Sequence, residues 1–378
     1  MIVTYALIGI CALYVLEYLF FSYGIRKARR RRETQETKGD FPFVSVVVAA
    51  RNEEKRIDLC LDALIAQDYP HDRFEVIIVD DESEDGTGRV VRDAMAAGST
   101  PIRLMTTVPE PGSLHGKSRA LAQGIDAASG EIILMTDADC QPTPTWISAV
   151  VGYMNDGADV VAGMTVVRGS SLFERLQMLD WLHLQAIAAA SMAFRSPVGA
   201  VGNNMAFRRS AYDAIGGYRR LPFSITEDFT LFLALCRAGF TIAYPCDRTL
   251  SVSTLACENL TEVLRQKHRW GRGGMESTPH GYSILVVAFF MLVALCAAPF
   301  VSPAAWLGVW GVKFLADLVL LLPVFHELGI RGAGRTFLPF QFYFLAQALV
   351  VPVMIINPNV SWKGRVFQTV RPGVEGER

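Results

Sequence analysis

Two carboxylates, Asp137 and Asp139, stand at the end of a short apolar run that follows Ser129-Gly130. The run from residue 132 to residue 135 predicts a buried strand. If the strand continues through both aspartates, their side chains point to the same side of it. Neighbouring carboxylates repel each other unless a cation lies between them, and Mg²⁺ typically takes one or two protein carboxylates together with substrate phosphates. The pair therefore indicates a divalent metal site, and a solvated acidic turn is the alternative that the pair alone leaves open.

A second acidic cluster follows another predicted strand. Residues 44–50 form a β-branched run that precedes the polar residues 51–54, and the apolar run 74–79 ends in Asp80-Asp81. Such continuous apolar runs are typical of strands that are covered on both faces. Alternating strand and helix patterns predict a mostly parallel sheet with helices on both faces, and such sheets bind ligands at the carboxyl ends of their strands. Both acidic clusters are therefore expected at one ligand-binding edge.

The remaining elements continue this alternation less regularly. The apolar stretch 172–194 carries several polar residues and is expected either as an amphipathic helix, at a membrane surface or under an acceptor site, or as a core helix. Residues 199–207 join glycines to two amides, Asn203 and Asn204, which are candidates to bind hydroxyl groups or to form a turn. The other expected helices and strands lie at residues 59–65, 90–95, 102–105, 117–128 and 160–167.

An acidic motif, Thr226-Glu227-Asp228, precedes an apolar helix that Gly239 is expected to end. Thr226 is expected as the N-cap, and the helix dipole favours carboxylates in the first turn. Taken alone, the motif therefore has a purely structural explanation.

Another helix start is predicted at Asn259, with Glu262 three residues later as in a capping box. In this helix Gln266, Arg269 and Trp270 are spaced at i, i+3 and i+4, so they share one face. The helix is expected to stop at the glycines that follow, Gly271, Gly273 and Gly274.

Composition points to a membrane protein. The chain has 378 residues, of which 51% are hydrophobic, and its mean hydropathy is +0.28. Residues 2–23 are long and apolar enough to span a bilayer. A basic block at 26–32 follows them and no basic residue precedes them, so the positive-inside rule places the N-terminus outside and the following residues in the cytoplasm. A cleaved signal peptide has the opposite polarity, and no recognised nucleic-acid-binding module accompanies the block.

Three further apolar spans are predicted at residues 283–301, 306–325 and 337–356. Lys313 and Asp317 in the second span are four residues apart and are expected to pair. Four full spans would place the C-terminus outside, although the basic tail suits the cytoplasm. A kink or re-entry at Pro339 and Pro352 would resolve this conflict, which the sequence leaves open.

The seven cysteines are scattered and form no Cys-x-x-Cys pair, so neither a zinc site nor a disulfide framework is indicated.

Five motifs of the chain, named at the end of this paragraph, resemble in type and order those of membrane-bound family 2 glycosyltransferases with a GT-A fold. That group includes cellulose, chitin and hyaluronan synthases and ceramide glucosyltransferase-like enzymes, and the resemblance covers residues 44–270 and the flanking apolar helices. Residues 362–365 resemble the tail of small bacterial members that glycosylate lipids. The motifs that carry the main resemblance are Val46-Val47-Val48-Ala49-Ala50-Arg51-Asn52-Glu53-Glu54, Val79-Asp80-Asp81-Glu82-Ser83, Asp137-Ala138-Asp139, Thr226-Glu227-Asp228 and Gln266-Lys267-His268-Arg269-Trp270.

The resemblance implies an α/β fold, namely a GT-A domain with a Rossmann-like, mostly parallel sheet, between N- and C-terminal transmembrane helices. The implied protein is a multi-pass protein of the cell (inner) membrane with its catalytic domain in the cytoplasm. The expected division is an N-terminal transmembrane helix, a basic juxtamembrane linker, a GT-A domain with amphipathic interface helices, a C-terminal transmembrane region of about three spans and a tail, at residues 1–24, 25–42, 43–275, 283–357 and 358–378 respectively.

The same resemblance implies an inverting transfer of a sugar, in which Asp228 is the general base. Glu227 and Arg269 are also expected at the catalytic centre. Asp139 would hold Mg²⁺ or Mn²⁺ with Asp137 beside it, and the metal would neutralise charge on the departing diphosphate. Donor-binding positions are implied at Ala50, Arg51, Glu53, Asp80, Asp81, Lys117, Asp137 and Asp139. Positions near the acceptor and the diphosphate are implied at Asn203, Asn204, Gln266, Arg269 and Trp270.

The partners implied are a nucleotide-sugar, expected as a UDP-sugar, a hydroxylated membrane lipid and the bilayer, with no nucleic acid. One alternative is a processive polysaccharide synthase, which shares the Gln266 to Trp270 motif. Another alternative is a membrane protein that senses nucleotide sugars without catalysis. Lys117 has an alternative too, as an exposed lysine at a helix start.

Overall fold

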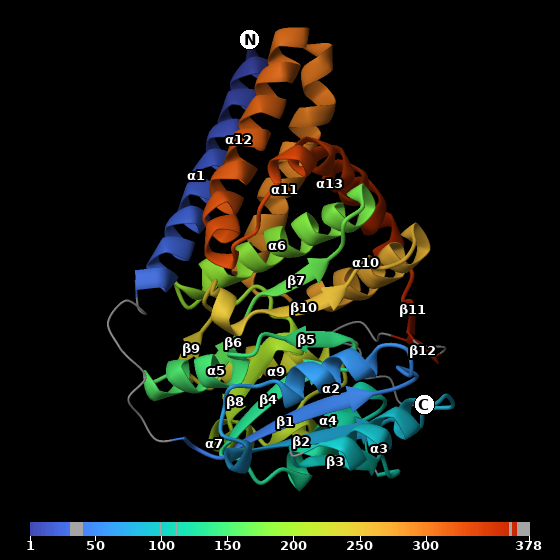
Figure 1. The fold of residues 1–378 in the computed structure, drawn as a ribbon. Helices are drawn as coiled ribbons and strands as arrows, with labels where there is room; N and C mark the ends of the chain where they lie inside the picture. Colours follow the sequence, from blue (N-terminus) through green and yellow to red (C-terminus); the bar gives the residue numbers. More distant parts are fainter. Residues whose placement is uncertain (31–40, 99, 111, 113, 363–364, 369–378) are drawn as a thin grey trace.

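The computed structural model describes residues 1–30, 41–98, 100–110, 112, 114–362 and 365–368. A layered α/β domain lies beneath a group of long helices (Figure 1). The predicted linker at 31–40, part of the basic block at 26–32, residues 363–364 of the predicted tail motif and residues 369–378 lie outside the described residues.

The central sheet has seven strands in the order β3-β2-β1-β4-β8-β6-β9. The first four are parallel to one another, β8 is antiparallel to β4 and β6, and β9 is parallel to β6. The sheet is thus mainly parallel, as predicted. Its strands are β1 (Val44–Ala50), β2 (Phe74–Asp80), β3 (Ile102–Thr106), β4 (Ile132–Asp137), β6 (Val160–Ala162), β8 (Met205–Arg208) and β9 (Ile242–Ala243).

Hydrophobic side chains cover both faces of this sheet. Along β1, Val46 and Val48 belong to one buried cluster and Val47 belongs to another, because neighbouring strand residues point to opposite faces. This confirms the prediction of strands covered on both sides. The helices of the α/β domain are α2 (Ile57–Ile65), α3 (Thr87–Ala97), α4 (Lys117–Ala127), α5 (Trp146–Asn155), α7 (Arg209–Ala214), α8 (Gly217–Arg220) and α9 (Glu227–Arg237).

The single strand predicted for residues 160–167 is wrong, because the structure has two strands there. β6 joins the central sheet, whereas β7 (Thr165–Arg168) joins a second sheet with β10 (Val252–Leu255) and β5 (Cys140–Pro142). Gly163 separates them, and a Cβ at this position would lie 2.3 Å from Leu250 Cδ1. Close packing at Gly163 therefore accompanies the change of sheet.

A long helix, α6 (Leu172–Met192), lies between the second sheet and the apolar helices. Residues 179–183 and 185–192 are buried. Gln185 fastens α6 to β7, because its side chain accepts from the Thr165 amide at 2.7 Å and donates to the Thr165 carbonyl at 2.8 Å. This burial favours the core-helix interpretation over a helix exposed at a membrane surface.

Among the residues that the structure describes, four helices are long and apolar enough to cross a membrane. Three of them, α1, α11 and α12, run side by side away from the sheets (Figure 1), whereas α13 lies across α6 and α10. The bounds are α1 (Ile2–Arg30), α10 (Leu260–Gly274), α11 (Pro279–Ala297), α12 (Pro303–Leu328) and α13 (Gly334–Ile355).

The end of α12 and the C-terminal end of α13 lie on the side of the sheets. Arg248 of the α/β domain lies against Gly329, which ends α12, and Arg272 of α10 donates to the Ile355 carbonyl at 3.1 Å. A short hairpin of β11 (Asn359–Trp362) and β12 (Arg365–Gln368) follows and packs against α10. α13 thus differs in direction from α1, α11 and α12, an arrangement that favours the re-entry considered for Pro339 and Pro352. All three C-terminal helices are apolar and long enough to span a membrane, and the number that does so stays a prediction.

A buried polar cluster joins these helices. The predicted pair of Lys313 and Asp317 is confirmed, with Nζ and Oδ2 2.6 Å apart. Asp317 also accepts from the Tyr14 hydroxyl of α1 at 2.8 Å, and Lys313 donates to Gln341 Oε1 of α13 at 2.8 Å. The cluster thereby connects α1, α12 and α13 through charged groups that are shielded from solvent.

Asp317→Ala is expected to lower the free energy of unfolding by about 3–5 kcal/mol, because it leaves Lys313 as a buried charge without its carboxylate. The double variant Lys313→Met/Asp317→Leu removes both charges and is expected to unfold at a temperature close to that of the unaltered protein. Thermal unfolding of the detergent-purified protein measures both. Equal destabilisation by the two variants would show that the charge pair is not the source of the effect.

Candidate functional site

The candidate site lies at the carboxyl ends of β1, β2 and β4. Strand register pairs Ala49 with Asp137 and Ala50 with Asp80, so residues from three sequence regions reach the same edge. A cavity of about 290 Å³ opens there. The predicted site residues that line it are Ala50, Arg51, Glu53, Asp81, Lys117, Asp137, Asp139, Asn203, Gln266 and Arg269.

The predicted metal-binding pair is close together but is not a continuous strand. β4 ends at Asp137, Asp139 lies in the turn after it, and β5 begins at Cys140. One carboxylate oxygen of each aspartate and the Cys140 sulfur all lie within 4.8 Å of one another. Two carboxylates facing a cavity suit a hard divalent cation such as Mg²⁺.

Cys140 contacts Asp139 from the buried side of the carboxylate pair. Its buried thiol donates to Asp139 Oδ1 at 3.5 Å and accepts from the Asn203 side-chain amide at 3.3 Å. Burial, together with the negative charges of Asp139 and Asp137, raises the pKa of Cys140 well above its usual value. The sulfur therefore stays protonated and orients Asp139 through a weak hydrogen bond.

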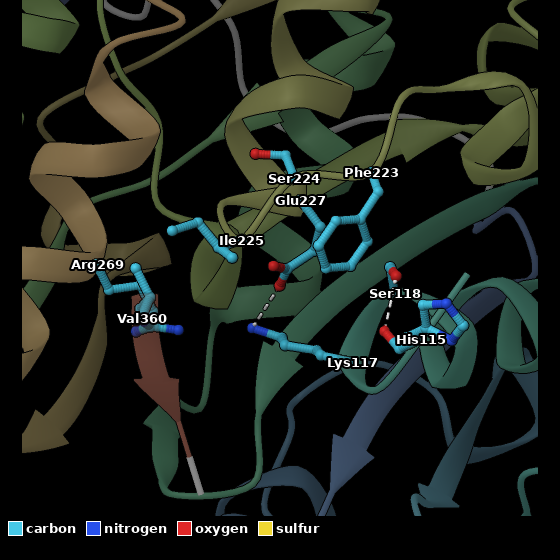
Figure 2. Close-up of a pocket in the computed structure, with 9 residues that line it drawn as sticks. All are labelled: His115, Lys117, Ser118, Phe223, Ser224, Ile225, Glu227, Arg269 and Val360. Atoms are coloured by element: carbon cyan, nitrogen blue, oxygen red, sulfur yellow. Dashed lines mark hydrogen bonds and ion pairs between the residues drawn. The ribbon is translucent and has the colours of Figure 1, made fainter. Parts of the chain in front are cut away.

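Lys117 lies between two acidic groups, which excludes the alternative of an exposed helix-start lysine. Its Nζ is 2.6 Å from Asp137 Oδ1 and 3.4 Å from Glu227 Oε1, and its side chain is only 16% exposed. Burial lowers the pKa of Lys117, but the carboxylates of Asp137, Glu227 and Asp228 outweigh burial and leave it above its ordinary value. Figure 2 shows Lys117 reaching Glu227 across a second, smaller hollow.

The acidic motif at the start of α9 presents its two carboxylates differently. Asp228 Oδ2 accepts from the Gly202 amide at 2.6 Å and Oδ1 accepts from the Phe229 amide at 2.8 Å. Glu227 lines the smaller hollow, and burial raises its pKa although the charge of Lys117 opposes that shift. Thr226 occupies the predicted N-cap position, but its side chain makes no capping hydrogen bond.

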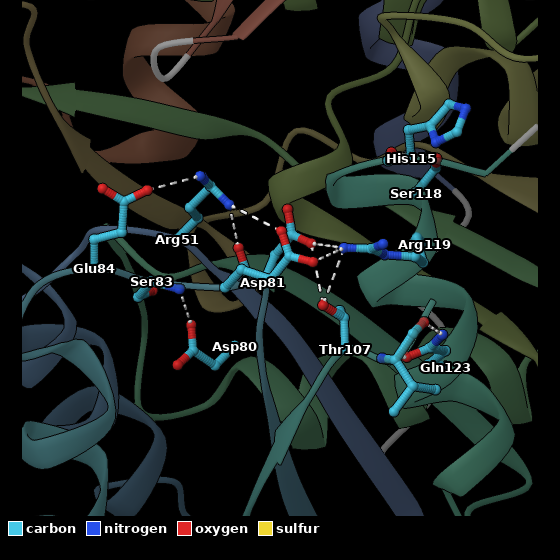
Figure 3. A network of polar contacts seen from close by, with 12 residues as sticks. Arg51, Asp80, Asp81, Ser83, Glu84, Thr107, His115, Ser118, Arg119 and Gln123 are labelled. Carbon is cyan, nitrogen blue, oxygen red and sulfur yellow. Dashed lines mark hydrogen bonds and ion pairs between the residues drawn. The ribbon is translucent and has the colours of Figure 1, made fainter. Parts of the chain in front are cut away.

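A compact polar network holds the other end of the cavity (Figure 3). Arg119 Nη2 donates to Asp81 Oδ1 at 2.9 Å and to Glu82 Oε1 at 3.0 Å. Arg51 Nη1 donates to the Asp81 carbonyl at 2.6 Å. The network thus fixes Asp81 at the cavity wall. Asp80 lies outside the cavity lining, and its carboxylate accepts from the Ser83 amide at 2.9 Å.

The helix that carries Gln266 and Arg269 ends at the last of the three glycines predicted to stop it, but it runs through the first two, Gly271 and Gly273. α10 continues to Gly274, because the missing side chains allow close packing. A Cβ at Gly273 would lie 2.2 Å from Thr226 Oγ1, and one at Gly271 would lie 2.5 Å from Ile355 Cδ1. The glycines thereby let α10 pack against the start of α9 and against α13. The predicted N-cap at Asn259 is confirmed, since its Oδ1 accepts from the Glu262 amide at 3.0 Å.

Two predicted site residues, Asn204 and Trp270, do not line the cavity and contact other parts of the protein instead. Asn204 accepts from Trp146 Nε1 at 2.9 Å and donates to the Met164 and Leu250 carbonyls, so its side chain is committed inside the protein. Trp270 packs edge-to-face on Trp181, with ring centroids 4.8 Å apart. Trp181, from α6, is the ring that lines the cavity.

Four residues that line the cavity or contact its acidic side chains were not predicted from the sequence. Trp181 and Arg265 line the cavity, Cys140 contacts Asp139, and Arg119 contacts Asp81. Arg119 follows Lys117 in the first turn of α4, so a second basic residue at that helix start was the available signal. For Trp181 no local signal existed, because α6 reaches the cavity only through the packing of distant elements.

Two family models match the chain. The model described as glycosyl transferase family 2 matches residues 45–216, and the model described as glycosyl transferase family group 2 matches residues 132–356. The second match alone covers more than half of the chain.

Curated relatives extend this similarity. The chain is 30% identical over 262 residues to the probable glycosyltransferase YdaM of Bacillus subtilis, which covers 68% of this chain and 59% of that protein. It is 29% identical over 262 residues to the beta-monoglucosyldiacylglycerol synthase of Trichormus variabilis, which covers 67% of this chain and 53% of the relative. The chain therefore spans little more than half the length of these relatives.

One solved structure shares the fold over almost the entire chain. The mannosyltransferase PcManGT of Pyrobaculum calidifontis, in complex with GDP-Man and Mn²⁺, aligns over 94% of this chain and 99% of that chain, with a TM-score of 0.59 and 21% identity. At this identity the likeness concerns the fold.

Proposed function

The chain belongs to glycosyl transferase family 2, and we propose that it moves a sugar from a nucleotide-sugar to a hydroxyl group of a membrane lipid, with inversion at the anomeric carbon. The observation that carries this proposal is a single cavity with three kinds of wall. Acidic strand ends form one wall, the Gln266–Arg269 face of α10 forms another, and Trp181 of the buried helix α6 forms the third.

The nucleotide is assigned to the end of the cavity that Arg51, Glu53 and Asp81 line. Asp81 is held by Arg119, so that a carboxylate is presented for the base or ribose without rearrangement. Ala50 leaves room beside it at the end of β1. Asp80 supports the turn after β2 from outside the cavity. A UDP-sugar is the donor that we propose.

A divalent cation, Mg²⁺ or Mn²⁺, fits beside Asp137 and Asp139. Support comes from their shared position in the cavity and from the Mn²⁺ in the similar mannosyltransferase. When bound, such an ion neutralises the charge that develops on a departing diphosphate. Arg269 and Lys117 line the same cavity and would add charge-assisted hydrogen bonds to the diphosphate.

Asp228 is proposed as the general base that takes the proton from the acceptor hydroxyl. The Gly202 amide orients its carboxylate, and Glu227 beside it contacts Lys117. Asn203 and Gln266 are proposed to bind sugar or acceptor hydroxyls. Trp181 would present its ring to a sugar, and Trp270 would support Trp181.

A lipid acceptor is supported by the surroundings of the cavity. α6 and α10 line the cavity and α13 packs against both, so we propose that an acceptor from the bilayer enters beside these helices. One relative is named for a glucosylated diacylglycerol. We propose that α1, α11 and α12 cross the cell membrane, and that the α/β domain lies in the cytoplasm, on the side of the basic residues at the C-terminal end of α1.

The proposal is tested by incubating the purified protein with a panel of UDP- and GDP-sugars and a total lipid extract, followed by mass spectrometry. A lipid that gains one sugar mass is the expected product. A ladder of repeated sugar masses would identify a processive synthase instead. Release of nucleotide with no glycosylated lipid or polymer would contradict both.

Gly202→Ala is expected to lower kcat by about 10²-fold, because small displacements of a reacting group are costly. A Cβ at this position would lie 2.4 Å from Asp228 Cβ and 2.7 Å from Asp228 Oδ2. Gly199→Ala is the matched control in the same segment, since its added Cβ would meet Ala188 Cβ at an ordinary 3.7 Å. Steady-state transfer assays compare the two. Equal rates for both variants would contradict the proposed placement of Asp228.

A further inference from the structure

Lys117 contacts one oxygen of Asp137, which is one of the two carboxylates of the proposed metal site. Its ammonium nitrogen lies 2.6 Å from Asp137 Oδ1, while oxygens of Asp137 and Asp139 lie within 4.8 Å of each other. The ammonium group therefore already balances part of the negative charge at this edge of the sheet. A divalent cation on the same carboxylate would lie within a few ångströms of the ammonium group, and although the carboxylate lies between the two cations, their repulsion weakens metal binding.

A second acidic group offers Lys117 another position. Glu227 Oε1 lies 3.4 Å from the ammonium nitrogen on the other side, where the smaller hollow opens. Lys117 lines both the main cavity and this hollow. Its flexible side chain can thus leave Asp137 without leaving acidic surroundings, because Glu227 remains in reach.

We propose that Lys117 is a built-in counter-cation that competes with the divalent metal for Asp137 and moves toward Glu227 and the donor diphosphate when metal and donor bind together. This rests on the proposed metal site at Asp137 and Asp139. The consequence is a metal site that is weak without nucleotide and becomes strong with it. The diphosphate supplies the anionic charge that lets both cations stay, so metal binding and donor binding are coupled.

The test measures Mn²⁺ binding to the full-length, detergent-purified protein by electron paramagnetic resonance, with no sugar transfer involved. Without nucleotide, Lys117→Met is expected to bind Mn²⁺ at least about 10-fold more tightly than the unaltered protein, because the competing charge is gone. Addition of UDP is expected to tighten Mn²⁺ binding in the unaltered protein, and to do so less in Lys117→Met.

Arg265→Met is the matched control, because it removes a positive charge from the lining of the same cavity without touching Asp137. A change of less than about 2-fold is expected for it. If Arg265→Met and Lys117→Met tighten Mn²⁺ binding equally, general charge and not competition at Asp137 explains the effect, and the proposal fails. It also fails if Lys117→Met binds Mn²⁺ no more tightly than the unaltered protein, or if UDP leaves the affinity of the unaltered protein unchanged.

Lys117→Gln repeats the test with a polar side chain in case the methionine variant does not fold, and thermal unfolding checks both. Asp139→Asn separates this proposal from the metal site on which it rests. Unchanged Mn²⁺ binding in Asp139→Asn would overturn the proposed metal site itself. Lost binding in Asp139→Asn together with unchanged binding in both Lys117 variants would overturn only the role of Lys117.

Discussion

Asp228→Asn is expected to lower kcat by about 10² to 10⁴-fold, the usual contribution of a positioned general base. An amide keeps the shape of the carboxylate, but its single oxygen can accept from only one of the Gly202 and Phe229 amides, which now donate to Oδ2 and Oδ1 of Asp228. It cannot take a proton from an acceptor hydroxyl. Donor binding should persist, because Arg51, Glu53 and Asp81, which line the end of the cavity assigned to the nucleotide, are unchanged. Transfer rates and nucleotide titration measure the two effects separately.

Glu227→Gln is the control for this result, since Glu227 is the neighbouring carboxylate and contacts Lys117. A smaller loss of kcat is expected for it than for Asp228→Asn. If the order is reversed and Asp228→Asn retains full turnover, Asp228 is not the base. Glu227, whose burial raises its pKa, would then be the proton acceptor.

Removal of divalent metal is expected to reduce transfer by at least about 10²-fold, because the charge on the departing diphosphate would lose a contribution of several kcal/mol. Dialysis against a chelator, followed by transfer assays, measures the loss. Added Mn²⁺ or Mg²⁺ should restore the rate. Asp139→Asn should show the same low rate without a chelator, and added metal should restore little of it.

The control for metal removal is the melting temperature of the chelated protein, which shows whether the α/β domain remains folded. Lost transfer with an unchanged melting temperature supports a role for the metal in the reaction. Full transfer in a chelated protein would contradict the metal assignment at Asp137 and Asp139. In that case Lys117, which contacts Asp137 at 2.6 Å, would be the cation left to stabilise the diphosphate with Arg269.

The strand ends were predictable from the sequence because their signal is local. Continuous apolar runs predict strands covered on both faces, and the end of each run locates Asp81 and Asp137 directly. The structure pairs these strands in parallel, so that their ends meet. The pairing of Lys313 with Asp317 was predictable for the same reason, since four residues form one helical turn.

The end of α10 was not predictable, because local propensity and tertiary packing oppose each other there. Glycine disfavours a helix interior, yet α10 runs through Gly271 and Gly273 where Ile355 and Thr226 leave no room for a Cβ. The split of residues 160–167 into β6 and β7 has a similar cause, because Leu250 packs closely against Gly163.

The sequence by itself determined which chemical groups the chain carries and which of them end a strand or begin a helix. Only the tertiary structure decided which groups share one cavity. It brought Trp181 to the cavity wall and placed Lys117 between Asp137 and Glu227. It also directed the side chain of Asn204 into the protein interior, where it accepts from Trp146. The physical reason is that these contacts join residues far apart in the chain, and their geometry depends on how whole helices and sheets pack.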